Sequence, residues 1–128
     1  MWTRYFFNFY QKVTNAEKGV YVVLHLYQNY IEKSMLVNQI LERVAKKYTD
    51  LKFLKILADK CIENYPDVKV PCLIIYKDGE LKHTMPRFDK KYSTISDDTF
   101  EDLLASIDLI EKKNTMDLHE AKELKSKF

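Results

Sequence analysis

Residues 22–27 read Val22-Val23-Leu24-His25-Leu26-Tyr27, an apolar run broken by His25 alone. Such a run is typical of a central strand that is covered on both faces. It leads through a polar turn into residues 34–45, where apolar side chains recur at helical spacing. The pattern predicts a buried strand followed by a helix packed on it. The helix positions expected to face the core are Met35, Val37, Ile40, Leu41 and Val44.

Two further strands and their connections follow from local patterns. Residues 51–58 predict a second strand, and the helix between the two strands favours a parallel crossover. Residues 59–65 predict a short helix or turn that Pro66 ends. Residues 72–76 and 80–85 flank Asp78-Gly79, a strong hairpin signal. A final helix begins after Ser96, whose hydroxyl is a good N-cap, and carries an apolar stripe from Phe100 to Ile110.

The first residues predict another helix. Over residues 2–12 aromatic side chains recur at spacings of three and four, and Gly19 ends the segment. Tyr5, Phe7 and Tyr10 make its apolar face wider than one docking stripe needs. Two interpretations are open: a helix packed on the sheet, or aromatic side chains left exposed where upstream chain or a partner once covered them.

Composition narrows the classes of function. A chain of 128 residues is long enough for one domain with its own core. A net charge of +2 gives no general attraction for nucleic acid or anionic membranes, and no run approaches the about 18 apolar residues of a membrane span. The start of the chain does not resemble a signal peptide. Two cysteines are too few for a disulfide framework, which favours a reducing compartment, so we expect a cytoplasmic protein.

The strand, turn and helix resemble the thioredoxin fold, and the details resemble the carboxy-terminal domain of phosducin-like proteins. The residues that carry the closer resemblance are His25-Leu26-Tyr27, Val37-Asn38-Gln39, residues 51–55, Cys61-Ile62 with Asn64-Tyr65-Pro66-Asp67, and Val70-Pro71-Cys72 with the strand after it. The resemblance covers about residues 10–89 and is strongest to the chaperonin-linked branch. It implies an α/β fold in three layers, a central mixed sheet flanked by helices. We expect residues 1–113 to form this single domain and residues 114–128 a charged tail, helical or disordered.

The resemblance also implies a function in protein contacts. Phosducin-like proteins act as co-chaperones of the cytosolic chaperonin for actin, tubulin or G-protein beta clients, or regulate G-protein beta-gamma dimers. They usually carry an amino-terminal helical region that this chain does not show, so we expect a fragment or a shortened member. The predicted partners are therefore proteins, with no nucleic acid, no membrane span, no cofactor and a monomeric state. The other hypotheses are a monothiol redox protein that uses Cys72 or Cys61, and an inactive thioredoxin-like subunit of a splicing complex.

Aligned on the thioredoxin pattern, the Cys-x-x-Cys pair falls on Ile31-Glu32-Lys33-Ser34, called here the corner loop. Dithiol exchange needs two thiols, which Ile31 and Ser34 do not supply, so we predict no redox catalysis there. Ser34 fits a helix N-cap better than a nucleophile. The resemblance places Pro71 where thioredoxins carry a cis-proline, beside which an extended chain could pair with the backbone of residues 70–72.

The remaining candidate residues have ordinary interpretations. Cys72 is expected to be a small buried hydrophobe, and Cys61 a structural or partner-facing thiol at the end of the preceding strand. His25 is expected to be a neutral core histidine. The three histidines show no metal-ligand spacing with the cysteines. Lys46-Lys47 and Lys90-Lys91 with Arg87 could form a basic patch for an acidic partner, or simply lie on solvated faces.

Overall fold

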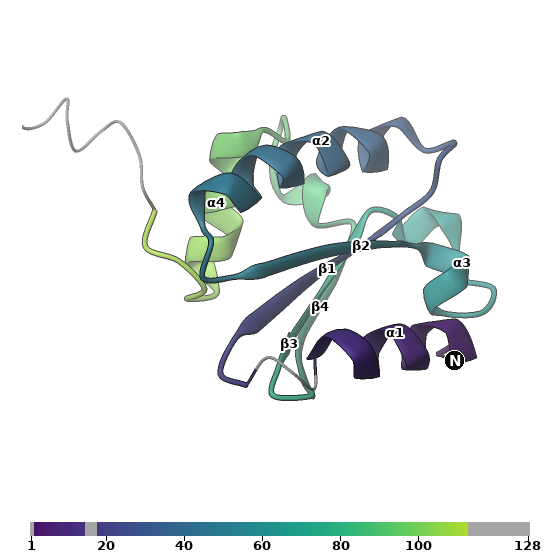
Figure 1. The fold of residues 1–128 in the computed structure, drawn as a ribbon. Helices are drawn as coiled ribbons and strands as arrows, with labels where there is room; N and C mark the ends of the chain where they lie inside the picture. The colour runs from purple at the N-terminus through teal and green to yellow at the C-terminus, as the bar shows by residue number, and fades with distance from the viewer. Residues whose placement is uncertain (1, 15–17, 113–128) are drawn as a thin grey trace, which may run out of the picture.

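The computed structural model describes residues 2–14 and 18–112, which form a mixed sheet between two layers of helices (Figure 1). The sheet has the order β2-β1-β3-β4; β2 is parallel to β1, and the other neighbours are antiparallel. Helices α2 and α4 lie on one face and α1 and α3 on the other. The three-layer α/β prediction is confirmed. The elements are α1 (Arg4–Thr14), β1 (Tyr21–Tyr27), α2 (Glu32–Lys47), β2 (Lys52–Leu57), α3 (Ala58–Cys61), η1 (Asp67–Lys69), β3 (Cys72–Lys77), β4 (Glu80–Pro86), η2 (Phe88–Lys91) and α4 (Asp97–Ser106).

Each face of the sheet has its own core. On the α2 and α4 face, Val23, Leu73 and Phe100 are fully buried among apolar helix residues. On the other face, Leu24, Ile74 and both cysteines pack beneath α1 and α3. The strand β1 supplies residues to both cores because successive side chains point to opposite faces. This explains why its sequence is apolar almost without interruption.

The aromatic helix α1 packs on the sheet, as the first interpretation predicted. Phe6 is buried and stacks on Trp2 with ring centroids 4.5 Å apart, and it also lies against Tyr76 of β3. Tyr5 and Phe7 point away and are 56% and 49% exposed. The turn after α1 is fixed to the hairpin because Gly19 donates its N–H to Asp78 Oδ1 at 2.6 Å.

Turn and cap chemistry sets the boundaries of the hairpin and of α4. Asp78 and Gly79 both have positive φ, as a two-residue type I′ hairpin turn requires. Ser96 caps α4: its side chain accepts the N–H of Thr99, and the Thr99 side chain accepts the N–H of Ser96. Both features were predicted from sequence. The tail expected at residues 114–128 lies outside the described residues.

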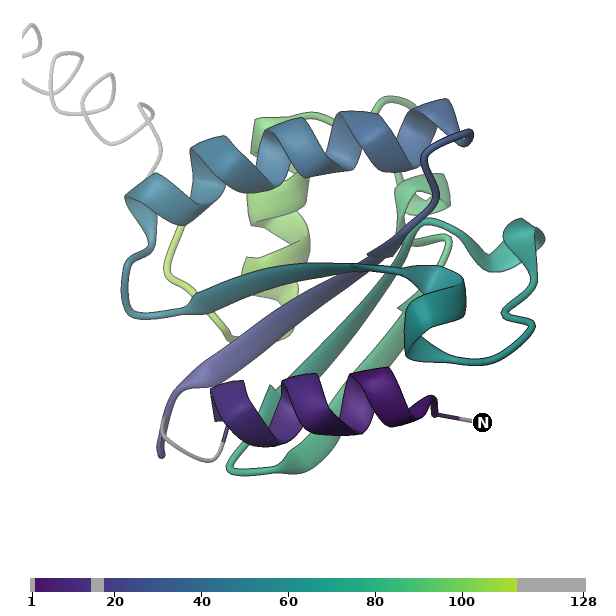
Figure 2. The same ribbon diagram turned by 45° about the vertical axis from the view of Figure 1, so that its right-hand side comes forward.

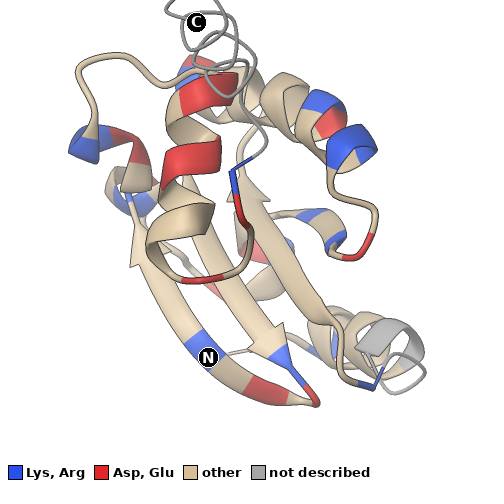
Figure 3. Cartoon of the chain, turned by 90° about the vertical axis from the view of Figure 1, so that its left-hand side faces the viewer, with Lys and Arg blue, Asp and Glu red and all other residues tan. Residues whose placement is uncertain are grey.

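Basic and acidic residues both lie on α2, whereas the charged residues of α4 are acidic (Figure 3). Arg43 of α2 pairs with Asp97 at 2.8 Å, and Lys47 pairs with buried Glu101 of α4 at 3.0 Å. Two members of the predicted basic patch, Lys47 and Arg87, are paired with the carboxylates of Glu101 and Asp89. The patch of Lys46-Lys47 and Lys90-Lys91 with Arg87 stays a prediction.

Candidate functional site at the corner loop

The corner loop lies where β1 ends and α2 begins. Ile31 has extended backbone angles and is the N-cap residue of α2. Glu32 and Lys33 are exposed in the first turn, whereas Ser34 is completely buried. The loop thus presents two charged side chains to solvent between the two positions at which the thioredoxin pattern has thiols.

Ser34 is not a helix cap, contrary to the prediction. Its hydroxyl accepts the backbone N–H of Gln28 at 3.1 Å and lies 2.8 Å from the carbonyl oxygens of Gln28 and Ile31, to one of which it donates. The side chain therefore points back toward the end of β1 rather than toward the free N–H groups of α2. It closes the turn between strand and helix, and the N-cap position falls on Ile31 instead.

Replacing Ser34 with alanine is expected to lower the free energy of unfolding by about 1–2 kcal/mol, because the buried Gln28 N–H and a buried carbonyl lose their partner. Chemical denaturation measures the change. The matched control is Ser93→Ala, at an exposed serine, which should stay within about 0.5 kcal/mol of the parent. Equal stability of the two variants would contradict the closing role of the Ser34 hydroxyl.

The loop before β3 lies beside the corner loop. The Val70–Pro71 peptide bond is cis, and the Pro71 carbonyl accepts the N–H of Arg87 at 2.7 Å. Tyr30 joins the two loops because its hydroxyl donates to Asp67 Oδ1 at 2.8 Å. The segment Asn64-Tyr65-Pro66-Asp67, which carries part of the family resemblance, has a structural role at each end. Asn64 takes a positive φ in the turn after α3, and Asp67 begins η1 and binds Tyr30.

A buried carboxylate completes the corner, and sequence reasoning missed it. Asp89 is 3% exposed and accepts two hydrogen bonds from the guanidinium of Arg87, at 2.9 and 2.8 Å. Lys33 of the corner loop lies 3.7 Å from the same carboxylate. Burial raises the pKa of Asp89, but Arg87 and Lys33 outweigh burial, so the pKa lies below its usual value. The spacing of Arg87 and Asp89, two residues apart, was the feature of the sequence that could have indicated this ion pair.

Large apolar side chains are exposed on the segments next to the corner loop and on η1. Tyr30 is 68% exposed and donates to Asp67, and the next residue, Val68, is 78% exposed. Met35 and Leu36, in the first turns of α2, are about two-fifths exposed. Met35 was predicted to face the core and does not, because the inward stripe of α2 runs through Ser34, Val37 and Asn38 instead. We call Tyr30 and Val68 the corner patch.

Both cysteines lie under the sheet rather than at the surface. Cys61 was expected at the end of a strand, but it ends α3. Cys72 begins β3, and neither cysteine side chain is exposed. Burial raises the pKa of Cys61 to about 12. Burial also raises the pKa of Cys72, although a hydrogen bond with Tyr65 works against that rise. At neutral pH these thiols stay protonated, which makes them weak nucleophiles.

His25 sits in the core behind the corner. Its Nδ1 lies 2.8 Å from Oδ1 of Asn38, so Nδ1 carries the proton because an amide oxygen can only accept. Nε2 is buried without a hydrogen-bond partner among the described residues. Burial lowers the pKa of His25 to about 4, although the bond to Asn38 acts in the opposite direction and Lys55 adds to the lowering. His25 is therefore neutral at physiological pH.

Comparison with solved structures shows the fold. The chain superposes on thioredoxin f2 of Chlamydomonas reinhardtii with a TM-score of 0.61 at 15% identity, covering 81% of this chain and 94% of that one. Fasciola hepatica thioredoxin gives a TM-score of 0.57 at 18% identity, covering 75% of this chain and 88% of that one. These superpositions establish a thioredoxin fold, and at such low sequence identity they say nothing about activity.

Comparison with curated proteins shows the family. Phosducin-like protein 3 of Danio rerio is 45% identical over 75 residues, which is 59% of this chain and 31% of the relative. Phosducin-like protein 1 of Dictyostelium discoideum is 38% identical over 100 residues, 77% of this chain and 32% of the relative. The domain belongs to the phosducin-like family. No family model matches the chain.

The phosducin-like chain spans about a third of the length of these relatives, so the match concerns one domain and not their whole activity. Within the described ranges, no helix combines the length and apolar character that crossing a membrane requires. The same residues contain no group of three or more side chains suited to holding a metal ion.

Proposed function

We propose that this phosducin-like domain is a non-catalytic adaptor of the co-chaperone type, a monomer that acts in the cytoplasm through contacts with other proteins. The finer proposal is that it assists the cytosolic chaperonin with clients such as actin, tubulin or G-protein beta subunits, or regulates G-protein beta-gamma dimers. The proposal assigns residues 1–113 to the domain and residues 114–128 to an accessory tail. Family membership supports these roles.

The observation that carries the proposal is the corner patch. Tyr30 and Val68 expose apolar surface beside the cis-Pro71 loop, at the place where thioredoxins carry their thiols. Large apolar or aromatic side chains at a concave or rimmed surface are what protein partners use as anchors. The exposed Lys33 of the corner loop adds a charge near this surface, and it pairs with the buried Asp89. An extended client segment pairing with the backbone near Val70 would fit the same surface.

Binding of the purified chain to purified cytosolic chaperonin tests the proposal. A Tyr30→Ser/Val68→Ser double variant is expected to weaken that binding about tenfold or more, since truncation of an anchoring side chain removes over 1 kcal/mol. Leu81→Ser, which changes an apolar residue 52% exposed on β4, is the matched control and should bind as the parent does. Chaperonin binding that is absent, or equally strong in both variants, contradicts the proposal.

An insulin disulfide-reduction assay separates the adaptor from the monothiol redox hypothesis. We expect no turnover above background, because the thiols of Cys61 and Cys72 are buried with raised pKa. Repeated turnover that is abolished by Cys72→Ser would instead establish an enzyme and overturn the adaptor.

A further inference from the structure

Three segments that are far apart in the sequence meet at one end of the sheet. Tyr30 before α2 donates to Asp67 of η1, and the N–H of Arg87 before η2 donates to the carbonyl of Pro71. Figure 2 shows the start of α2, η1 and η2 close together at the right-hand end of the sheet. Charged side chains from all three segments therefore share one surface.

Exposed lysines lie on each of these segments. Lys33 in the first turn of α2 is 65% exposed, and Lys69 of η1 and the Lys90-Lys91 pair of η2 are exposed too. Burial raises the pKa of Cys72, and the positive charge of Lys69 is among the groups that oppose this rise, so Lys69 lies close to the cis-Pro71 loop. We call this set the lysine rim: Lys33, Lys69, Lys90 and Lys91.

The carboxylates of these segments do not balance the lysine rim. Asp89 is buried and accepts two hydrogen bonds from Arg87, so the ammonium group of Lys33 stays exposed beside a carboxylate that already has a partner. Asp67 accepts a hydrogen bond, and Glu32 is exposed in the first turn of α2. Over the three segments, five cationic side chains stand against three carboxylates, so the surface has an excess of positive charge.

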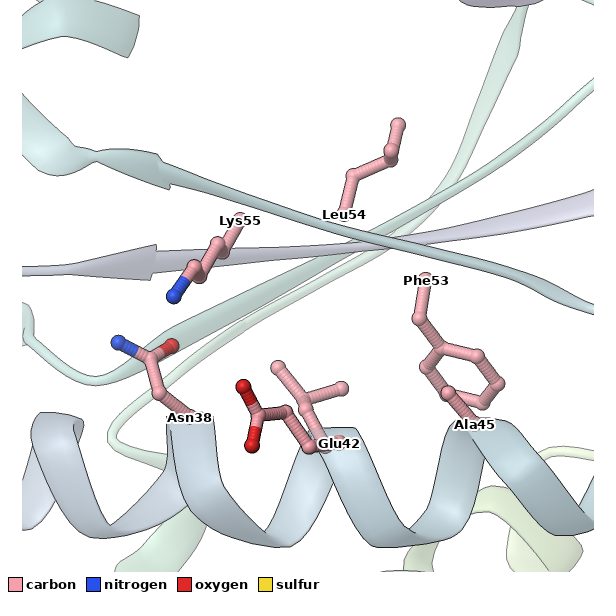
Figure 4. A pocket seen from close by; sticks show the side chains of 7 residues that line it. Asn38, Glu42, Ala45, Phe53, Leu54 and Lys55 are labelled. Atoms are coloured by element: carbon pink, nitrogen blue, oxygen red, sulfur yellow. The ribbon is translucent and has the colours of Figure 1, made fainter.

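Basic side chains nearby have partners within the chain. Lys112, after α4, pairs with Asp98 and Asp102 at 2.6 and 2.7 Å. Lys55 of β2 points toward α2, where Glu42 lies across the same hollow (Figure 4). In the part of the chain that the structure describes, the lysines of η1 and η2 have no ion pair. Their charges are therefore available to a partner.

We propose that the lysine rim binds an acidic, extended segment of a partner protein, whose carboxylates lie beside the lysines and whose apolar side chain contacts Tyr30 and Val68. The inference rests on the proposed function and names the chemistry of the segment that the corner patch receives. Opposite charges around an interface speed association and exclude wrong partners, because like charges placed there cost affinity.

A protein segment fits this surface better than nucleic acid or an anionic membrane. A DNA duplex carries one phosphate charge about every 1.7 Å, so it would bring anionic groups against Asp67 and Glu32 as well as against the lysines. A peptide can place its carboxylates opposite the lysines alone. The exposed Val68 also favours an apolar side chain over a phosphate group.

A second copy of this chain is a poor occupant, because the acidic side chains of α4 are already engaged. Asp97 and Glu101 pair with basic side chains of α2, and Asp98 and Asp102 pair with Lys112. Docking α4 on the lysine rim of another molecule would first break these pairs.

The probe is the synthetic peptide acetyl-Glu-Asp-Leu-Val-Asp-Glu-amide, titrated into the chain and followed by NMR. We expect saturable shifts in the amides of residues 30–34, 67–71 and 87–91. The matched peptide acetyl-Gln-Asn-Leu-Val-Asn-Gln-amide keeps the apolar centre but removes the charge, and it is expected to bind about tenfold more weakly. Equal binding of the two peptides, shifts centred elsewhere, or no saturation at millimolar acidic peptide would overturn the proposal.

Charge reversal tests the residue assignment. Lys69→Glu/Lys90→Glu should weaken binding of the acidic peptide about tenfold or more, and should gain affinity for a peptide with Lys at each acidic position, which also shows that the variant folds. Lys18→Glu/Lys46→Glu is the control with the same net charge and should bind as the parent does. Lys18 precedes β1, and Lys46 lies about 20 Å along α2 from Lys33. Equal weakening in both double variants would overturn the proposal.

The inference and the proposed function can fail separately. Chaperonin binding through the corner patch that is unchanged in Lys69→Glu/Lys90→Glu would overturn the inference alone. Binding of the acidic peptide at the lysine rim without any binding of chaperonin would overturn the proposed function alone. Tighter binding of oligodeoxythymidine, or of phosphatidylcholine vesicles that contain phosphatidylserine, than of the acidic peptide would assign the lysine rim to a polyanion and overturn the inference.

Discussion

Replacing Arg87 with leucine is expected to lower the free energy of unfolding by about 3 kcal/mol at neutral pH. The guanidinium makes two hydrogen bonds to Asp89, whose carboxylate is almost completely buried. Breaking a buried ion pair by removing one partner costs about 3–5 kcal/mol, and the lower value applies because Lys33 remains 3.7 Å away. Leucine suits the site because it keeps an unbranched Cβ at a residue whose φ is +49°.

The pH dependence identifies the cause. In the parent the pKa of Asp89 is lowered on folding, so its contribution is complete above the unfolded value near 4 and is lost as the pH falls through the folded value. In the variant, burial dominates and the carboxyl takes up a proton more readily. The deficit of the variant should therefore shrink as the pH falls toward 4, in urea titrations of both proteins.

The matched control is Lys33→Leu, which removes the same charge from the same carboxylate. The Lys33 side chain is 65% exposed, so its ion pair is screened by solvent and should contribute less than about 1 kcal/mol. Equal losses in the two variants would mean that net charge, and not the bidentate pair, stabilises the corner.

Local chemistry was enough to predict much of the fold. The Asp78-Gly79 turn and the Ser96 cap each follow from residues within four positions of one another, and both lie where the sequence placed them. The apolar run of β1 predicted a strand covered on both faces. Successive side chains point to opposite faces, and when both faces are buried neither one offers a position for solvated polar side chains. Such features depend on backbone preferences and patterning that a single segment contains.

The site could not be read in the same way. The hydroxyl of Ser34 was available to cap a helix or to close a turn, and only the position of Gln28 decides between them. Met35 stands at a helical spacing compatible with the core, yet it lies on the flank of α2 because the sheet meets the helix along Val37 and Val44. Arg87 looked available for a partner because its carboxylate becomes buried only when η2 packs on the sheet. These choices depend on tertiary geometry, which sequence spacing does not contain.

The place of β2 in the sheet shows the same limit at a larger scale. The strand predicted over residues 51–58 is β2, which is parallel to β1 as expected, but the pattern does not say where a strand lies in the order of the sheet.

Acidification from pH 6.5 to pH 4 is expected to lower the free energy of unfolding by about 3 kcal/mol through His25 alone. The pKa of His25 is 6.5 when unfolded and about 4 in the core, where burial opposes the charged form more strongly than Asn38 supports it. The unfolded chain therefore binds more protons between these values, and a difference of this size corresponds to about 3 kcal/mol. The contribution is complete above pH 6.5 and lost progressively as the pH falls to 4.

His25→Leu separates this residue from the carboxylates. Leucine fills a similar volume and removes both the titrating group and the unpartnered Nε2, at the cost of the bond to Asn38. We expect stability near that of the parent at neutral pH and a much flatter profile between pH 6.5 and 4, measured by urea denaturation at each pH. Asp89 and Asp97, whose pKa values are lowered on folding, lose their contributions below this window. If stability falls with pH between 6.5 and 4 as steeply in the variant as in the parent, folding does not lower the pKa of His25. The hydrogen bond to Asn38 would then offset the effect of burial.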